Sequence, residues 1–217
     1  MELQTESDTY PARLEVDYPE HLGRLSTLLR IPFSIPIWIL SALMPIAPVI
    51  LVSLAADGLV DENSVNGAAA AAFFLPLVLM LLFRQKYPRW WFNFSLELIR
   101  FQYRVGAYGE LLTDKYPSTD EEQTVHLDLD YPDAENLNRF LPIIKWILLI
   151  PHYVVGIILA AFSLVAVIAS WFAILATGRY PHPLFDFVVG VGRYWLRISA
   201  YGFLLITDRY PPFKLGE

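Results

Sequence analysis

The sequence predicts a mainly α-helical membrane protein that is built from two tandem repeats. Hydrophobic residues make up 55% of the chain and charged residues 18%, whereas soluble domains are about 25% charged. Long apolar stretches carry no charge. Two similar phrases, "RVGAYGELLTDKYP" and "RISAYGFLLITDRYP", begin at Arg104 and Arg197. The composition is typical of a membrane protein, and the repeated phrase indicates a duplication.

The similarity between the two halves extends beyond this phrase. "RLEVDYP" from Arg13 corresponds to "HLDLDYP" from His126, and "KYPRWWFNF" from Lys86 corresponds to "RYPHPLFDF" from Arg179. Because the matches keep the same order, we expect both repeats to share one architecture. We divide the chain into a polar tail (1–9), a first repeat (10–118), a linker (119–123), a second repeat (124–213) and a second tail (214–217).

Each repeat begins with a predicted β-strand. Residues 13–19 and 125–131 alternate between apolar and polar side chains, which is typical of half-buried strands. The Leu-Leu…Thr-Asp-(Lys/Arg)-Tyr-Pro ends of the repeats are candidate strand partners. An open strand edge cannot lie in hydrocarbon, so we expect these short strands on the cytoplasmic side of the membrane.

The first repeat then predicts a transmembrane hairpin. Residues 37–56 and 68–83 are uncharged, and the acidic loop between them contains no Lys or Arg. Basic residues lie before the first stretch and after the second. The positive-inside rule therefore places both ends of this hairpin, and both termini of the chain, in the cytoplasm.

The second repeat leaves two alternatives open for residues 146–177, which carry no charge. As one straight helix this stretch is about 48 Å long, well beyond the hydrocarbon thickness. It can form a tight or re-entrant hairpin that turns near Ala160–Ser163, which the similarity to the first repeat favours. It can also form an interfacial helix up to Pro151 followed by one span, which the absence of a turn signal favours. We take the hairpin as the prediction.

After its apolar region, each repeat predicts an amphipathic helix in the membrane interface. Polar residues recur every three or four positions on one face, and aromatic residues occupy the rest. Interfacial arginines can bind lipid phosphates through paired hydrogen bonds. The candidate contacts to lipid headgroups or a partner are Arg100, Arg104, Arg193, Arg197, Trp90, Trp91 and Trp195. Alternatively, Arg100 and Arg104 pair with Glu97, and Arg193 pairs with Asp186, which would only orient the helices.

No motif in the sequence indicates an enzyme. The chain contains no cysteine, its four histidines lack metal-ligand spacing, and it has no nucleotide-binding or hydrolase signature. We therefore expect no catalytic residues, no metal and no cofactor. The net charge of −6 gives no indication of nucleic-acid binding.

The assembled motifs resemble a prokaryotic membrane family described as domain of unknown function 4389. The resemblance is carried by "LDLDYPDAENLNRFLPIIKWILLIPH" and "WFAILATGRYPHPLFDFVVGVGRYWLRISAYGFLLITDRYPPF" in the second repeat, and more loosely by the first. The first repeat departs from this pattern because no His follows Pro36 and an acidic loop is inserted. The resemblance implies a polytopic or interfacial membrane module, and it implies no activity and no catalytic residues.

These observations lead us to expect a non-enzymatic, multi-pass protein of the cytoplasmic membrane. The expected role is an accessory or scaffold subunit of a membrane complex, a lipid-binding module, or both. The expected partners are membrane lipids together with a membrane protein or a second copy of the chain. The alternative is a lipid scramblase or lipid transporter that uses the interfacial arginines.

Overall fold

The computed structural model describes residues 10–30, 32–39, 86–119, 121, 123–133, 137–138 and 140–216. Its elements are β1 (Ala12–Val16), α3 (Arg89–Gly109), β2 (Val125–Leu129), α4 (Leu141–Leu148), α5 (Ile150–Thr177) and α6 (His182–Gly202); residues 24–30 and 32–39 are also helical. The described part is therefore mainly helical, as predicted. The hairpin predicted over residues 37–83 lies almost wholly outside the described residues, and the duplication stays a prediction.

The two strands form one antiparallel sheet. Leu14 lies opposite Leu127, and both side chains are buried, at 4% and 3% exposure. The polar residues between the buried positions point to the other face, so the alternation correctly predicts both strands. The idea that the Leu-Leu…Tyr-Pro ends supply strand partners is wrong, because residues 110–117 and 203–211 contain no strand.

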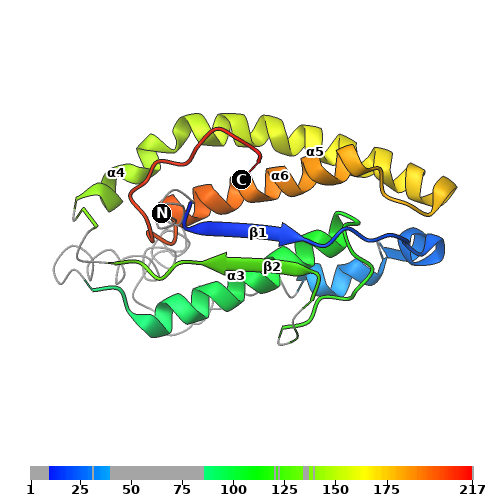
Figure 1. The fold of residues 1–217 in the computed structure, drawn as a ribbon, viewed down its shortest axis with the longest axis horizontal. Coiled ribbons are helices and arrows are strands. Elements are labelled where there is room, and N and C mark those ends of the chain that lie inside the picture. The colour runs from blue at the N-terminus through cyan, green and yellow to red at the C-terminus, as the bar shows by residue number, and fades with distance from the viewer. Residues whose placement is uncertain are drawn as a thin grey trace, which may run out of the picture.

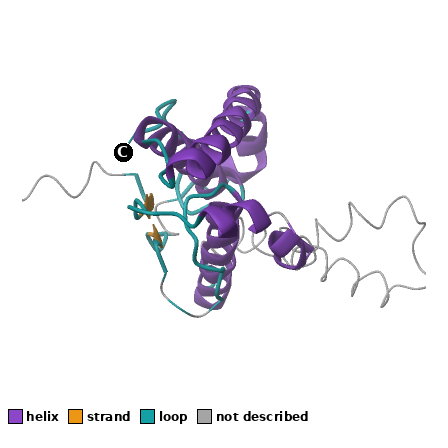
Figure 2. Cartoon of the chain, turned by 90° about the vertical axis from the view of Figure 1, so that its right-hand side faces the viewer, coloured by secondary structure: helices purple, strands orange, loops and turns teal. Residues whose placement is uncertain are grey.

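The sheet lies between two long helices. β1 contacts α6, which is remote from it in the sequence, and β2 contacts α3, the helix that precedes it. Figure 1 shows α5 and α6 side by side along the same direction as the strands, and Figure 2 shows this layering from the end. α6 is the central helix of the described part, since it contacts β1, α4 and α5.

The position of α6 corrects the prediction of an interfacial helix. Leu196, Ile198 and Ala200 have no exposed surface, and Tyr194 is 1% exposed. The aromatic and branched face that we expected at headgroup depth packs instead against protein. A helix with one broad apolar face satisfies the same sequence pattern in either environment, so the pattern alone does not distinguish them.

Tyr-Pro pairs mark the start of both long helices beside the sheet. α3 begins directly after Pro88, and α6 begins directly after Pro181, each with an extended proline at the N-cap. The main-chain carbonyls of the tyrosines before these prolines accept hydrogen bonds. Tyr131 Oη donates to Tyr87 O at 2.5 Å, and Tyr18 Oη donates to Tyr180 O. These bonds join the strand ends to the helix starts.

The hairpin prediction for residues 146–177 is wrong. α4 is followed by a single continuous α5 of 28 residues, about 42 Å long, and Ala160–Ser163 lie inside it. The interior of α5 contains no proline, and Pro151 lies in its first turn, where proline is tolerated. α5 ends at Thr177 and is followed by Gly178, whose φ of 75° is the left-handed conformation that glycine adopts readily. The alternative of a short helix followed by one long helix agrees with the structure.

α5 and α6 approach closely at Gly156. A Cβ atom at this position would lie 2.8 Å from Cζ2 of the Trp195 ring. We expect Gly156→Ala to lower the free energy of unfolding by about 1–2 kcal/mol, because overpacking against a rigid ring outweighs the better helix propensity of Ala. Thermal unfolding followed by circular dichroism checks this, with Gly106→Ala as the control, since a Cβ there meets no atom within 4 Å. A destabilisation of the same size in both variants would contradict the close approach.

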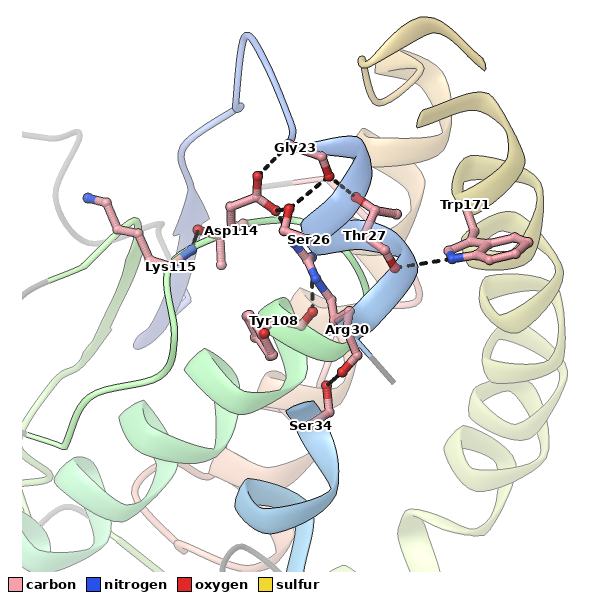
Figure 3. A network of polar contacts seen from close by, with 10 residues as sticks. Gly23, Ser26, Thr27, Arg30, Ser34, Tyr108, Asp114, Lys115 and Trp171 are labelled. Carbon is pink, nitrogen blue, oxygen red and sulfur yellow. Dashed lines mark hydrogen bonds and ion pairs between the residues drawn. The ribbon is translucent and has the colours of Figure 1, made fainter. Parts of the chain in front are cut away.

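A polar cluster ties the helical residues 24–30 to the end of α3 (Figure 3). Asp114 accepts hydrogen bonds from Gly23 N at 2.7 Å and from Arg30, which also donates to Tyr108 O at 3.2 Å. Burial lowers the pKa of the Arg30 guanidinium, and the Asp114 carboxylate opposes this shift. Trp171 Nε1 donates to Thr27 O at 3.3 Å and joins the same segment to α5.

Candidate functional site

Arg100 and Arg193 bind the central residues of the sheet. Arg100 Nε donates to Leu127 O at 2.9 Å, and Arg193 Nε donates to Leu14 O at 2.8 Å. Leu14 and Leu127 are the residues that face each other across the strand pair. Each arginine side chain therefore joins its own helix to the main chain of one strand.

Arg104 and Arg197 lie deeper than the membrane-interface position that the sequence predicted for them. Their exposed fractions are 7% and 4%. Arg104 Nη1 donates to Ser118 O at 3.0 Å, while Arg197 donates to Lys214 O at 2.9 Å and Gly216 O at 2.5 Å. The main chain that follows each helix thus supplies acceptors to the buried guanidinium.

Glu97 forms the predicted ion pair with Arg100, at 2.8 Å from Oε1 to Nη1. Asp128 of β2 adds a second pair to the same guanidinium at 2.9 Å. The pairing of Arg193 with Asp186 stays a prediction.

The candidate tryptophans occupy two separate places. Trp90 is 69% exposed at the start of α3, and its ring meets the half-buried Trp91 ring edge-on, with 5.7 Å between centroids. Trp195 packs against Gly156 between α5 and α6. The aromatic residues at the start of α3 agree with an exposed contact, whereas Trp195 is half-buried between α5 and α6.

Arg193 and Arg197 share a cavity of about 550 Å³ with basic residues that the sequence analysis did not select. We call it the cationic cavity. Its charged lining residues are Arg13, Glu15, Arg193, Arg197, Arg209 and Lys214, and Tyr10 and Tyr210 also line it. These residues come from β1, α6 and the segment after α6, so only the folded chain assembles the site.

The charges of the cationic cavity favour an anion. Five basic side chains line it against one carboxylate, and Asp130 neutralises part of the charge of Arg13 through an ion pair of 2.7 Å. Burial raises the pKa of Tyr10, so its hydroxyl stays a donor, bonded to Arg197 O and Arg209 O at 3.3 Å each. Guanidinium and ammonium groups in this number suit a phosphate.

The described residues contain no group of three or more His, Asp or Glu side chains that could hold a metal ion. One sequence feature could have pointed to a basic residue of the cationic cavity that the sequence analysis did not select. Lys115 and Arg209 occupy the same position of the repeated Thr-Asp-(Lys/Arg)-Tyr-Pro phrase, although only the structure shows that Arg209 lines a cavity.

Fold and site together define a mainly helical protein with a cationic cavity and one described helix that is long and apolar enough to cross a membrane. Residues 142–214, from α4 to the segment after α6, match the family described as "Domain of unknown function (DUF4389)". The predicted resemblance to this family is confirmed over that segment. No curated protein and no solved structure matches the chain.

Proposed function

We propose that the protein is a non-enzymatic, accessory membrane protein that binds an anionic lipid headgroup in the cationic cavity. The observation that carries this proposal is the connection between the cavity and an exposed apolar surface. Tyr210 lines the cavity, and its hydroxyl donates to Leu148 O at 3.0 Å, at the junction of α4 and α5. A phosphate in the cavity would therefore lie beside the surface that suits lipid chains.

The apolar surface covers the outside of α4 and α5. Its large exposed side chains include Ile143, Trp146, Ile147, Ile157, Ile158, Phe162, Leu164, Val165, Ile168 and Phe172. Only 22% of the most apolar part of α5 is buried, which is low for the core helix of a soluble protein. A continuous exposed apolar surface of this kind marks an interaction site, and its aliphatic and aromatic composition suits lipid.

The arrangement of the layers limits how lipid can surround α5. α5 runs beside α6, and α6 contacts β1 (Figure 1). The sheet carries exposed charges such as those of Arg13 and Asp128, and a charged open edge is not stable in hydrocarbon. Among the described elements we therefore assign lipid to the outer face of α4 and α5, with the sheet in water. We also propose a multi-pass topology with cytoplasmic termini. This part rests on the apolar residues 37–56 and 68–83 and on the basic residues that flank them.

The duplication is also part of this proposal, and corresponding contacts in the two halves support it. Arg100 and Arg193 make the same bond to corresponding strand residues. Asp114 and Asp208, at the same position of the repeated phrase, each pair with a buried base, Arg30 in one case and Lys145 in the other. We propose that the two repeats exchange their first strands, which would make each half incomplete without the other.

Charge removal in the cationic cavity tests headgroup binding. We expect the double variant Arg209→Gln/Lys214→Gln to bind dioctanoyl phosphatidylglycerol roughly 10- to 30-fold more weakly, since each basic residue near a lipid surface contributes about 1 kcal/mol. Microscale thermophoresis in a neutral maltoside detergent measures this affinity. Dioctanoyl phosphatidylcholine is the comparison lipid, and wild-type affinity for the anionic lipid should fall with salt.

Lys86→Gln/Lys115→Gln is the matched control, because it removes the same charge from residues outside the cavity. The control should keep the affinity of the wild type. Equal loss in both double variants would indicate a non-specific charge effect, and equal wild-type affinity for the two lipids would refute the proposal.

A further inference from the structure

A second cavity, of about 630 Å³, lies among α3, α5, α6 and the sheet. We call it the apolar chamber. Aliphatic residues form most of its wall, including Leu14, Val125, Val167 and Val188. Its volume is typical of sites that hold a small molecule. It contains none of the basic residues of the cationic cavity, so the two cavities differ in the ligand they can accept.

Glu110 provides a single carboxylate in the described wall of the apolar chamber. It follows directly after α3 and is half-buried. No hydrogen bond or ion pair joins its side chain to another group in the described part of the chain. The charged form of a carboxylate on an apolar wall is unfavourable unless an opposite charge compensates it. A cationic ligand would supply that opposite charge.

Three aromatic residues line the same chamber, namely Trp38, Tyr103 and Trp195. The rings of Trp38 and Trp195 are held against glycines, with hypothetical Cβ atoms at Gly109 and Gly156 lying 3.3 Å and 2.8 Å from them. The hydroxyl of Tyr103 donates to Gly192 O at 3.1 Å and is therefore occupied. Aromatic rings beside a carboxylate are the combination that recognises an alkylammonium group, by cation–π attraction and charge.

The wall of the chamber also connects with the surface assigned to lipid. Leu164 of α5 lines the chamber and is 62% exposed. A molecule in the membrane could therefore reach the chamber beside this helix. The described wall has no Lys or Arg, so an anionic headgroup would meet repulsion from Glu110 and no compensating charge.

We propose that the apolar chamber binds the alkylammonium end of a single-chain amphiphile, with Glu110 as its counter-ion and the aromatic rings as its walls. The cation compensates the carboxylate, and the hydrocarbon chain fills the aliphatic part. This site is separate from the cationic cavity, so its ligand and its test do not depend on headgroup binding there.

Titration calorimetry with dodecyltrimethylammonium below its micelle concentration tests the proposal, using the full chain in a neutral maltoside detergent. We expect Glu110→Gln to weaken binding at least about tenfold, because it removes the charge and keeps the shape. Glu97→Gln is the matched control, since Glu97 is an exposed carboxylate on α3 and lies outside the chamber. It should bind as the wild type does.

Gly106→Leu is a second, independent variant. Gly106 lines the chamber, and a Cβ atom there meets nothing within 4 Å, so a leucine side chain would occupy the ligand's space without a clash at its first atom. We expect this variant to lose binding and to unfold at the same temperature as the wild type or higher. Gly106→Ala should keep most of the affinity.

Binding should also strengthen from pH 6 to pH 8 in the wild type and not in Glu110→Gln. Burial raises the pKa of Glu110 to about 7, so its charge develops in this interval. The other ionisable groups near it are Tyr103 and Tyr180, and burial raises the pKa of both; β1, β2, α5 and α6 contribute no ionisable group to the described wall. Wild-type affinity in Glu110→Gln or Gly106→Leu would overturn the proposal, as would equally tight binding of dodecyl sulfate.

Discussion

Asp208→Asn is expected to lower the free energy of unfolding by about 3 kcal/mol, because it leaves the buried ammonium group of Lys145 without its counter-ion. Lys145 has no exposed surface. Its Nζ lies 2.8 Å from Asp208 Oδ1 and donates to Thr207 O at 2.7 Å, over the Tyr201 ring at 4.8 Å. Burial lowers the pKa of Lys145, and the hydrogen bond and charge of Asp208 oppose this shift.

The exposed pair between Arg13 and Asp130 gives the matched control. Its side chains are 48% and 50% exposed, so Asp130→Asn should cost less than about 1 kcal/mol. Chemical unfolding in maltoside, followed by tryptophan fluorescence, measures both variants. The double variant Lys145→Met/Asp208→Asn should recover part of the loss, since no buried charge remains. Equal costs for the two single variants would contradict the role of burial.

The cluster around Asp208 has a counterpart around Asp114. Asp208 accepts from Asn138 N at 2.6 Å, and Asp114 accepts from Gly23 N at 2.7 Å. Each carboxylate therefore accepts a hydrogen bond from the main chain just before a helical segment and also pairs with a buried base. In both places, an aspartate in the segment after a long helix binds the segment that leads into an apolar stretch.

Local patterns were sufficient to predict several elements. The alternation of residues 13–19 and 125–131 gave strands that overlap β1 and β2, and the three- to four-residue spacing of polar side chains predicted helices that overlap α3 and α6. These features depend on neighbouring residues, whose spacing can be read directly. The pairing of β1 with β2, and the packing of β1 on α6, depend on contacts between residues far apart in the sequence.

The incorrect predictions have a common physical origin. An apolar stretch is compatible with lipid on both sides or protein on one side, so residues 146–177 did not reveal that α6 covers one face of α5. Likewise, the apolar face of α6 fits a membrane surface as well as a protein core. Arg197 shows the same limit, because its main-chain acceptors lie after α6 and are brought to it only by folding.

The cationic cavity and the apolar chamber were not predicted as sites. Arg13 and Arg193 line the first, and Trp38 and Trp195 line the second, although each pair is far apart in the sequence. Glu110 carries no distinguishing sequence pattern, since its counterpart in the second repeat is Phe203. That difference is informative after the fact, because a charge at only one of two corresponding positions indicates that the repeated architecture does not require it.

The stability of the protein is expected to fall as pH rises from about 5 to 7.5, with Glu110 contributing on the order of 2–3 kcal/mol to this change. Burial raises the pKa of Glu110 from 4.5 to about 7. Between these values the unfolded chain has lost the proton that the folded protein still holds, so raising the pH favours unfolding. Each unit of pKa difference corresponds to about 1.4 kcal/mol.

Glu110→Gln removes this dependence, so the comparison with the wild type isolates it from other carboxyl groups. The variant should match the wild type near pH 4.5 and exceed its stability increasingly up to pH 8, as measured by chemical unfolding at a series of pH values. Glu97→Gln should give no such gain, because Glu97 pairs with Arg100. A stability difference between Glu110→Gln and wild type that stays constant with pH would show that Glu110 is solvated. The charged carboxylate would then carry no desolvation cost for an alkylammonium ligand to offset. If the difference grows as expected, adding dodecyltrimethylammonium at pH 8 should stabilise the wild type and leave Glu110→Gln unchanged, because only the wild type has a buried charge to compensate.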